Sequence, residues 1–137
     1  MKAKDLMFGS WVIAVYQACC NAKVIHQINY QDYILESDRE NYLEHQEIEY
    51  LPLPLTRKIL EKNGFLDSYI NEKLDKSKIY IWYDVYGYEV TVDMKSNNIK
   101  VKHDTKILLD LWYTEKVPVH ELQLALKHCG IKKEITL

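Results

Sequence analysis

Residues 79–103 read IYIWYDVYGYEVTVDMKSNNIKVKH, and this stretch decides the fold. Apolar and polar side chains alternate along it, which is the pattern of strands with one buried and one solvated face. Two clusters of turn-forming residues, at 84–87 and 95–98, divide it into three segments. The stretch therefore predicts a three-stranded antiparallel meander.

The first turn sets the register of the first two strands. Residues 84–87 (DVYG) place Asp at the first position and Gly at the fourth, which suits a type I turn followed by a left-handed Gly bulge. In this hairpin Trp82 lies opposite Val90, and Tyr80 lies opposite Val92. Both pairs then face the same side of the sheet.

The second turn sets the register of the third strand. Residues 95–98 (KSNN) are predicted to form a four-residue polar loop. This loop sets Met94 opposite Ile99 and Val92 opposite Val101. Because side chains alternate along a strand, both registers give one nearly continuous apolar face for the core. We expect this face to carry Tyr80, Trp82, Tyr88, Val90, Val92, Met94, Ile99 and Val101.

The other face of the meander is expected to meet water over its second and third strands. It carries Glu89, Thr91 and Lys102, with Asp93 directly opposite Lys100 as a favourable cross-strand pair. The first strand breaks this polarity, because Ile79, Ile81 and Tyr83 also lie on the outer face. These three residues form an apolar strip that either another part of the chain or a binding partner would cover.

Two helices are predicted, and each ends at a glycine. Thr56 caps the first helix, and Gly64 ends it in the left-handed conformation so that Phe65 folds back on Leu60. The second helix spans about 118–129. Pro118 suits its first turn, Gly130 ends it, and Ile131 returns to Leu126. Its buried stripe is expected to cover the meander and consists of Val119, Leu122, Ala125, Leu126 and Cys129. The far side carries His120, Gln123, Leu124 and Lys127.

The first part of the chain predicts a small curled β-sheet or partial barrel. Short apolar and β-branched runs at 11–16, 23–29, 32–36 and 47–51 indicate strands, and 37–41 is a polar connection. The proline-rich joint at 51–55 separates two regions, 1–54 and 55–137, which we expect to pack as one unit. Residues 66–76 fit either a helix or a loop, and residues 107–116 fit either a strand or a helical turn. The predicted fold class is α+β.

Composition excludes several classes of function. The chain has 137 residues, a formal net charge of −2 and only four glycines, which are too widely spaced for a Rossmann or P-loop phosphate site. No apolar run approaches the roughly 20 residues of a membrane-spanning helix. The three cysteines include no C-x-x-C pair, and residues 1–5 show no signal-peptide pattern. We therefore expect a cytoplasmic protein without a membrane partner.

No catalytic, cofactor-binding or metal-binding residues are assigned from the sequence. His120 and His128 would lie about 80° apart around their helix and about 12 Å along it, so they cannot share one ion. A nucleophile pair of Cys20 and His26 is compatible with the spacing, but nothing selects it. The acidic residues of the N-terminal half have the ordinary pattern of a solvated surface, and they are Glu36, Asp38, Glu40, Glu44, Glu47 and Glu49.

Three segments carry a resemblance to a known family. They are LMFGSWV at 6–12, the stretch from PLPLT at 52–56 to ILEKNGF at 59–65, and VHELQ at 119–123 with the Gly130-Ile131 ending. Together they resemble a family of short uncharacterised bacterial proteins, often associated with prophages or other mobile elements of gut anaerobes. The resemblance implies an N-terminal small barrel followed by an α+β portion and brings no activity. In that pattern a turn with Gly would stand at Cys19-Cys20.

The sequence favours a non-enzymatic protein-interaction or accessory module. The chain has eleven Tyr and three Trp against two Phe, and Tyr and Trp are common in interface cores. The candidate surface is the strip of Ile79, Ile81 and Tyr83, and the expected partner is another protein or a second copy of the chain. The alternative is nucleic-acid binding by the N-terminal strands, with an enzyme as the third hypothesis. In that alternative, stacking aromatics would lie beside basic residues, namely Trp11, Tyr16, Tyr30 and Tyr33 with Lys23 and Arg39.

Overall fold

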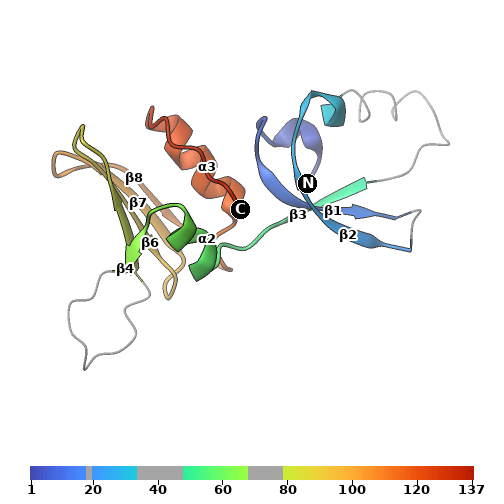
Figure 1. The fold of residues 1–137 in the computed structure, drawn as a ribbon, viewed down its shortest axis with the longest axis horizontal. Coiled ribbons are helices and arrows are strands. Elements are labelled where there is room, and N and C mark those ends of the chain that lie inside the picture. The colour runs from blue at the N-terminus through green and yellow to red at the C-terminus, as the bar shows by residue number, and fades with distance from the viewer. Residues whose placement is uncertain (18–19, 34–47, 68–78) are drawn as a thin grey trace. The chain divides into compact units, whose positions relative to one another are not determined.

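The computed structural model describes residues 1–17, 20–33, 48–67 and 79–137 (Figure 1). The chain divides into two compact units, Met1–Leu53 and Pro54–Leu137. Each unit contains its own antiparallel sheet, and helices accompany both sheets. The predicted α+β class is confirmed.

The first unit is built on a three-stranded sheet with β1 at its centre. The strands are antiparallel and are β1 (Trp11–Tyr16), β2 (Ala22–Gln27) and β3 (Ile48–Pro52). A short 3-10 helix, η1 (Ala3–Asp5), precedes them. One face of the sheet is buried by the small core of this unit, whose members are Ala3, Leu6, Val12, Ala14, Ile28 and Tyr50. In the described residues this sheet is open and is not a closed barrel.

The strand predicted at 32–36 is wrong where the structure describes it. Residues 30–33 are helical instead, and residues 34–36 lie outside the described residues, as does the polar connection at 37–41. Asn29 caps the helical turn, because its Oδ1 accepts hydrogen bonds from the backbone N–H groups of Gln31 and Asp32. Asp32 also bonds to Asn29, since its Oδ2 accepts a hydrogen bond from the Asn29 N–H at 2.7 Å. This reciprocal capping starts a helix rather than a strand.

The second unit contains a five-stranded antiparallel sheet in the order β4-β5-β6-β7-β8. The helix α2 (Arg57–Lys62) precedes the sheet, and α3 (Val119–His128) follows it and lies over one of its faces (Figure 1). The strands are β4 (Leu66–Asp67), β5 (Ile79–Tyr83), β6 (Tyr88–Asp93), β7 (Asn98–His103) and β8 (Lys106–Trp112). Residues 66–76 were predicted as a helix or a loop, but residues 66–67 form strand β4, and residues 68–76 lie outside the described residues.

The predicted register of the first hairpin is confirmed. Trp82 pairs with Val90 and Tyr80 with Val92. The Asp84 carboxylate accepts hydrogen bonds from the N–H groups of Tyr86 and Tyr88, which fixes the turn. The residues predicted to form this turn are therefore the ones that close the hairpin.

The predicted register of the second hairpin is wrong by two residues. Val92 lies opposite Ile99 rather than Val101, and Lys100 lies opposite Thr91 rather than Asp93. The turn starts earlier than predicted because the Asp93 carboxylate accepts hydrogen bonds from the backbone N–H groups of the next turn residues, Lys95 and Ser96. Asp93 consequently pairs with Asn98.

The face assignments are unaffected, because a shift of two residues keeps every side chain on the same side of a sheet. Five residues of the predicted core face are buried, namely Tyr80, Val90, Val92, Ile99 and Val101. The other three, Trp82, Tyr88 and Met94, are half-buried. The outer-face residues Glu89, Thr91 and Lys102 are also half-buried.

Both predicted helix endings are confirmed. Gly64 has φ of 84°, and the Phe65 N–H donates to the Leu60 carbonyl. Gly130 has φ of 71°, and the Ile131 N–H donates to the Leu126 carbonyl. These backbone bonds are those of the Schellman motif, which needs a left-handed residue that glycine adopts without strain.

The start and the polar side of α3 differ from expectation. Pro118 is the N-cap, with extended backbone, rather than a residue of the first turn. His120 was expected on the far side of the helix, but it is buried. Cys129 is half-buried. The rest of the predicted stripe is buried, and it consists of Val119, Leu122, Ala125 and Leu126.

The segment at 107–116, left open by the sequence, contains β8. A two-residue turn joins β7 to β8, and its residues Asp104 and Thr105 both have positive φ, at 46° and 74°. Two such residues are characteristic of the type I′ turn that joins closely paired strands. A β-bulge in the β7–β8 pair follows this turn, next to Val101 and Lys102.

Candidate functional site

A buried carboxylate, Asp32, is the centre of a polar cluster in the first unit. The Asp32 side chain is 8% exposed, and His26 Nε2 lies 2.9 Å from each of its oxygens. The Tyr50 hydroxyl donates to Asp32 Oδ1 at 3.0 Å, and the Asn29 N–H donates to Oδ2. Three donors thus satisfy this carboxylate, as a buried charge requires. The cluster ties the helical turn at 30–33 to strands β2 and β3.

The structure does not bring Cys20 to His26. Cys20 lies in the turn before β2 and is exposed, with φ of 57°. His26 lies four residues beyond Ala22, the first residue of β2, which corresponds to about 13 Å along a strand. A thiolate attack assisted by His26 needs hydrogen-bond reach between the two side chains, so this pair is excluded.

The aromatic residues of the nucleic-acid hypothesis do not form one platform. Trp11 and Tyr16 lie five positions apart on β1, so they face opposite sides of the sheet. The Tyr33 hydroxyl donates to the Leu6 carbonyl, whereas Tyr30 is exposed. Lys23 is exposed on β2, and Arg39 lies outside the described residues. Stacking of successive bases needs aromatic rings along one groove.

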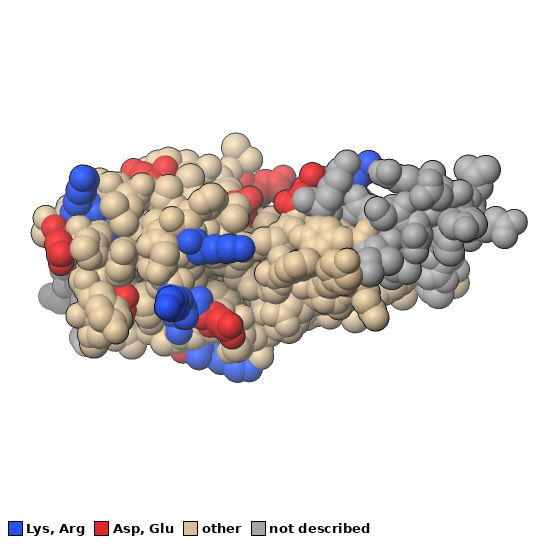
Figure 2. Space-filling model, turned by 90° about the horizontal axis from the view of Figure 1, so that it is seen from above, with Lys and Arg blue, Asp and Glu red and all other residues tan. Residues whose placement is uncertain are grey.

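Basic side chains are dispersed on the face of the molecule drawn in Figure 2. Lysine and arginine side chains form separate groups there, with acidic side chains between them. A nucleic-acid interface normally gathers basic residues into a stripe or patch. The described residues drawn there show no such patch.

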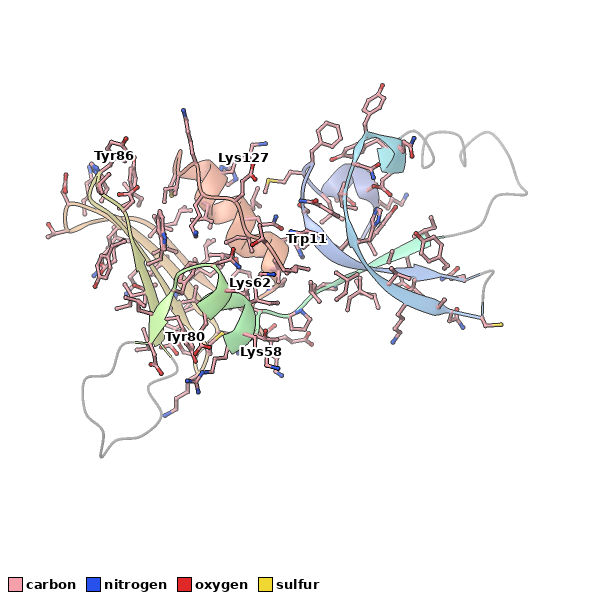
Figure 3. The ribbon with its side chains drawn as sticks, in the orientation of Figure 1. Trp11, Lys58, Lys62, Tyr80, Tyr86 and Lys127 are labelled. Atoms are coloured by element: carbon pink, nitrogen blue, oxygen red, sulfur yellow. The ribbon has the colours of Figure 1, made fainter. Side chains whose placement is uncertain are left out.

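The predicted strip of Ile79, Ile81 and Tyr83 lies on the outer face of β5. The two-residue strand β4 covers the edge of β5 only at Tyr80 and Ile81, and it sets Leu66 opposite Ile81. Ile79 and Ile81 are half-buried, and Tyr83 is 60% exposed. Beyond Tyr83, Tyr86 marks the tip of the β5–β6 hairpin, whereas Tyr80 lies toward the other end of the sheet (Figure 3). The role of the strip as an interaction surface stays a prediction.

A groove of about 560 Å³ lies between β8 and α3. Leu109 and Leu111 line it from β8, and Tyr113 lines it directly after the end of this strand. Four residues line it from the helix, and they are Glu121, Leu124, Ala125 and His128. Most of this lining is apolar, so the groove is suited to apolar side chains.

The groove exists because α3 packs over β7 and leaves β8 partly uncovered. Ile99 and Val101 on β7 are fully buried, whereas their partners Leu111 and Leu109 on β8 are only half-buried. All four side chains point to the same face of the sheet, because directly opposed residues share a face. The helix therefore covers one of these two neighbouring rows and leaves the other open.

The second edge of β8 has no neighbouring strand in the part of the chain that the structure describes. The Tyr113 N–H donates to the Asn97 carbonyl at 2.9 Å, so Tyr113 and Asn97 form a hydrogen-bonded pair at the end of the β7–β8 ladder. Bonded and non-bonded pairs alternate in an antiparallel ladder. The backbone N–H and C=O groups of Asp110 and Trp112 therefore point away from β7, toward the open edge.

One wall of the groove carries a carboxylate in an apolar surrounding. Glu121 Oε2 accepts a hydrogen bond from the Tyr113 hydroxyl at 3.2 Å. Burial raises the pKa of Tyr113, and the neighbouring Glu121 charge raises it further. The adjacent His120 is buried, its Nδ1 has no hydrogen-bond partner among the described residues, and burial lowers its pKa. Of these three groups only His120 is buried, whereas Glu121 and Tyr113 are half-buried.

The groove is not among the features predicted from the sequence, although the sequence contains two signals of it. Leu109, Leu111 and Tyr113 stand at alternate positions, which places three large side chains on one face of a strand. Leu124 stands on the predicted solvent side of its helix, where an apolar residue is less common. Which strand would lie beside this helix is a property of the assembled sheet, and the local pattern does not contain it.

Searches for other kinds of site and for similar proteins give no assignment. Within residues 1–17, 20–33, 48–67 and 79–137, no three His, Cys, Asp or Glu side chains are grouped to hold a metal ion. None of the helices in those ranges has the length and apolar character to cross a membrane. No known protein family, curated protein or solved structure matches the chain.

Proposed function

We propose that the chain is a non-enzymatic protein-interaction module that binds an extended segment of a protein chain along the open edge of β8. One observation carries the proposal. The outward-pointing backbone groups of Asp110 and Trp112, which no described strand pairs with, lie beside an apolar groove between Leu111 and Leu124. An added strand could use both features at once.

Strand addition combines two sources of binding energy. Main-chain hydrogen bonds to an exposed edge give affinity, and pockets for alternate side chains give specificity. On this chain, every second side chain of an added strand would face the same side as Leu109 and Leu111, where the groove lies. A Lys or Arg among these side chains would lie near the Glu121 carboxylate, which is the acidic group of the lining. The preferred segment is therefore apolar at alternate positions, and a basic residue among them would add an ion pair with Glu121.

The proposed class of function, a protein-interaction module, is the one expected from the sequence. The proposed binding surface is different, because it lies at β8 and not at β5. The strip of Ile79, Ile81 and Tyr83 has less free strand edge beside it, since β4 pairs with β5 at Tyr80 and Ile81. The nucleic-acid hypothesis lacks a shared aromatic platform, as described above. An accessory role in bacteria or their prophages and a cytoplasmic location stay predictions.

Selection from a library of random linear peptides displayed on phage would test the proposal. The full chain is immobilised at low density, so that neighbouring copies do not compete for the edge. We expect enrichment of peptides with alternating apolar residues. Hydrogen exchange of the complex with one synthetic enriched peptide should then slow at the amides of Asp110 and Trp112.

Two variants separate the groove from the rest of the surface. Leu111→Lys places a charge at the groove and should weaken peptide binding at least about tenfold, equivalent to about 1.4 kcal/mol. Val85→Lys makes the same change at the exposed hairpin tip and should leave binding unchanged. Failure to enrich any peptide, or binding that Leu111→Lys leaves intact, would overturn the proposal.

A further inference from the structure

The edge strand β8 is unusually apolar for a strand that has no second neighbour within the described ranges. Ile107, Leu108 and Trp112 are 52%, 41% and 65% exposed. Soluble proteins normally protect such edges with Lys, Pro, bulges or covering segments. Here Lys106 and the bulge protect only the beginning of the strand.

The second half of β8 has no such protection. From Leu109 to Tyr113 there is no Pro and no Lys, and the single charged residue is Asp110. The Asp110 carboxylate accepts a hydrogen bond from Asn98 Nδ2 at 2.7 Å, so it is held within its own sheet. An unprotected edge of this kind is a template for pairing with another strand.

The strand is suited to pair with itself. Two identical edges related by a two-fold axis form an antiparallel pair, in which each residue contacts the same set of residues on the other copy. Such pairing must join the outward-pointing backbone groups of Asp110 and Trp112 to those of the second copy. The point through which the axis passes then defines the register.

Charge and geometry select one register. An axis at Asp110 sets the two Asp110 carboxylates opposite each other, which is unfavourable. An axis at Leu109 pairs Asp110 with Leu108, where the bulge disturbs the ladder. An axis at Trp112 pairs Asp110 with Thr114, which lies beyond the end of β8. An axis at Leu111 pairs Asp110 with Trp112 twice, so all the outward groups of these two residues are used.

We infer that two copies of the chain associate through β8 in an antiparallel pair centred on Leu111, joining their five-stranded sheets. The inference rests on the proposed function, because it assigns the occupant of the same edge. In this register Leu111 lies opposite Leu111 of the second copy, and Leu109 lies opposite Tyr113 of the second copy. These are the half-buried residues that α3 leaves uncovered.

Site-specific disulfide formation tests the register directly. The three native cysteines, Cys19, Cys20 and Cys129, are first replaced by Ser. Leu111→Cys, Asp110→Cys and Trp112→Cys are then introduced one at a time, and each protein is oxidised and separated without reductant. Leu111 forms a non-hydrogen-bonded pair across the axis, with Cα atoms about 4.5 Å apart, which suits a disulfide. We expect Leu111→Cys to cross-link at least about tenfold faster than the other two variants.

Sedimentation velocity over a range of protein concentrations measures the association itself. We expect a reversible dimer, Leu111→Lys to raise its dissociation constant at least tenfold, and Val85→Lys to leave it unchanged. If Leu111→Lys fails to fold, as judged by circular dichroism, the cross-linking rates decide alone. A chain that is monomeric at all concentrations, or that cross-links faster through Asp110→Cys or Trp112→Cys, overturns the inference.

The two proposals fail in different ways. A monomeric chain that still binds the selected peptides loses the dimer and keeps the proposed function. A chain that neither binds peptides nor associates loses both. A dimer with the expected cross-link supports both, because the second copy is then the extended segment that β8 binds.

Discussion

The two units of the molecule treat a carboxylate in very different ways. Asp32 in the first unit is buried and receives hydrogen bonds from three groups of its own unit, with its side chain 8% exposed. Glu121 in the second unit lines an open groove and receives one hydrogen bond from Tyr113, with its side chain 31% exposed. The acceptor positions of Asp32 are used by groups of its own unit, whereas Glu121 can accept a hydrogen bond from a further group in the groove.

The difference separates structural from functional polar residues. A buried charge that is fully hydrogen-bonded within the protein stabilises one arrangement of its elements and offers nothing to a ligand. A carboxylate at an apolar groove keeps free acceptor positions that a partner can use. Substitutions in the first unit should therefore act on stability, and substitutions at the groove should act on association.

The largest effect is expected for Asp32→Ala. This change leaves His26, Tyr50 and the Asn29 N–H without their acceptor, and we expect a loss of about 3 kcal/mol in the free energy of unfolding. Urea denaturation followed by circular dichroism measures it. Asp5→Ala, at an exposed carboxylate of the same unit, should change stability by less than about 0.5 kcal/mol. Equal effects of the two substitutions would contradict the structural role of Asp32.

A matched pair of hydroxyl deletions gives a smaller effect. Tyr50→Phe removes a buried donor to Asp32 and should cost about 1 kcal/mol. Tyr113→Phe removes a donor at the rim of the groove, where water can replace it, and should cost less than about 0.5 kcal/mol. The same denaturation experiment compares them. A larger loss for Tyr113→Phe would show that the groove, rather than the Asp32 cluster, depends on its polar contacts for stability.

The smallest effect is expected in the pH dependence of stability. Burial lowers the pKa of His120 below its ordinary value of 6.5, although the nearby Glu121 acts in the opposite direction. The unfolded chain therefore binds this proton more readily than the folded chain does. The stability that neutral His120 contributes is fully present above pH 6.5 and is lost as the pH falls through the folded pKa.

The variant His120→Gln isolates this contribution. Between neutral and mildly acidic pH, we expect the variant to lose less stability than the wild-type protein, measured by urea denaturation at each pH. His103→Gln serves as the control, because His103 is considerably more exposed. Identical pH profiles for the wild-type protein and His120→Gln would contradict the assigned burial of His120.

Several features could be predicted from the sequence because they depend on neighbouring residues. The Asp84 turn, the Thr56 cap and the glycine endings at Gly64 and Gly130 form where they were expected. Each requires one residue type at one position, and the bond it makes reaches only a few residues along the chain. The capping pair of Asn29 and Asp32 belongs to the same class, and its pattern was present in the sequence but was outweighed by the apolar residues around it.

The second hairpin shows the limit of such reasoning. Lys95-Ser96-Asn97-Asn98 has the composition of a turn, but the Asp93 carboxylate accepts hydrogen bonds from the N–H groups of Lys95 and Ser96, and the turn starts one residue earlier. Both registers bury the same face, so the apolar pattern could not distinguish them. The burial of His120 likewise depends on what packs against the first turn of α3, which its helical position alone does not determine.

By itself, the sequence determined the alternation that gives each strand a buried face and the local bonds that start and end the helices. Only the tertiary structure decided that β8 is an edge, that α3 covers β7 rather than β8, and that a groove remains between them. The physical reason is the distance along the chain between the groups that interact. A turn or a cap is fixed by groups a few residues apart, whereas an edge is defined by the strand that is missing beside it, and that depends on the packing of the whole unit.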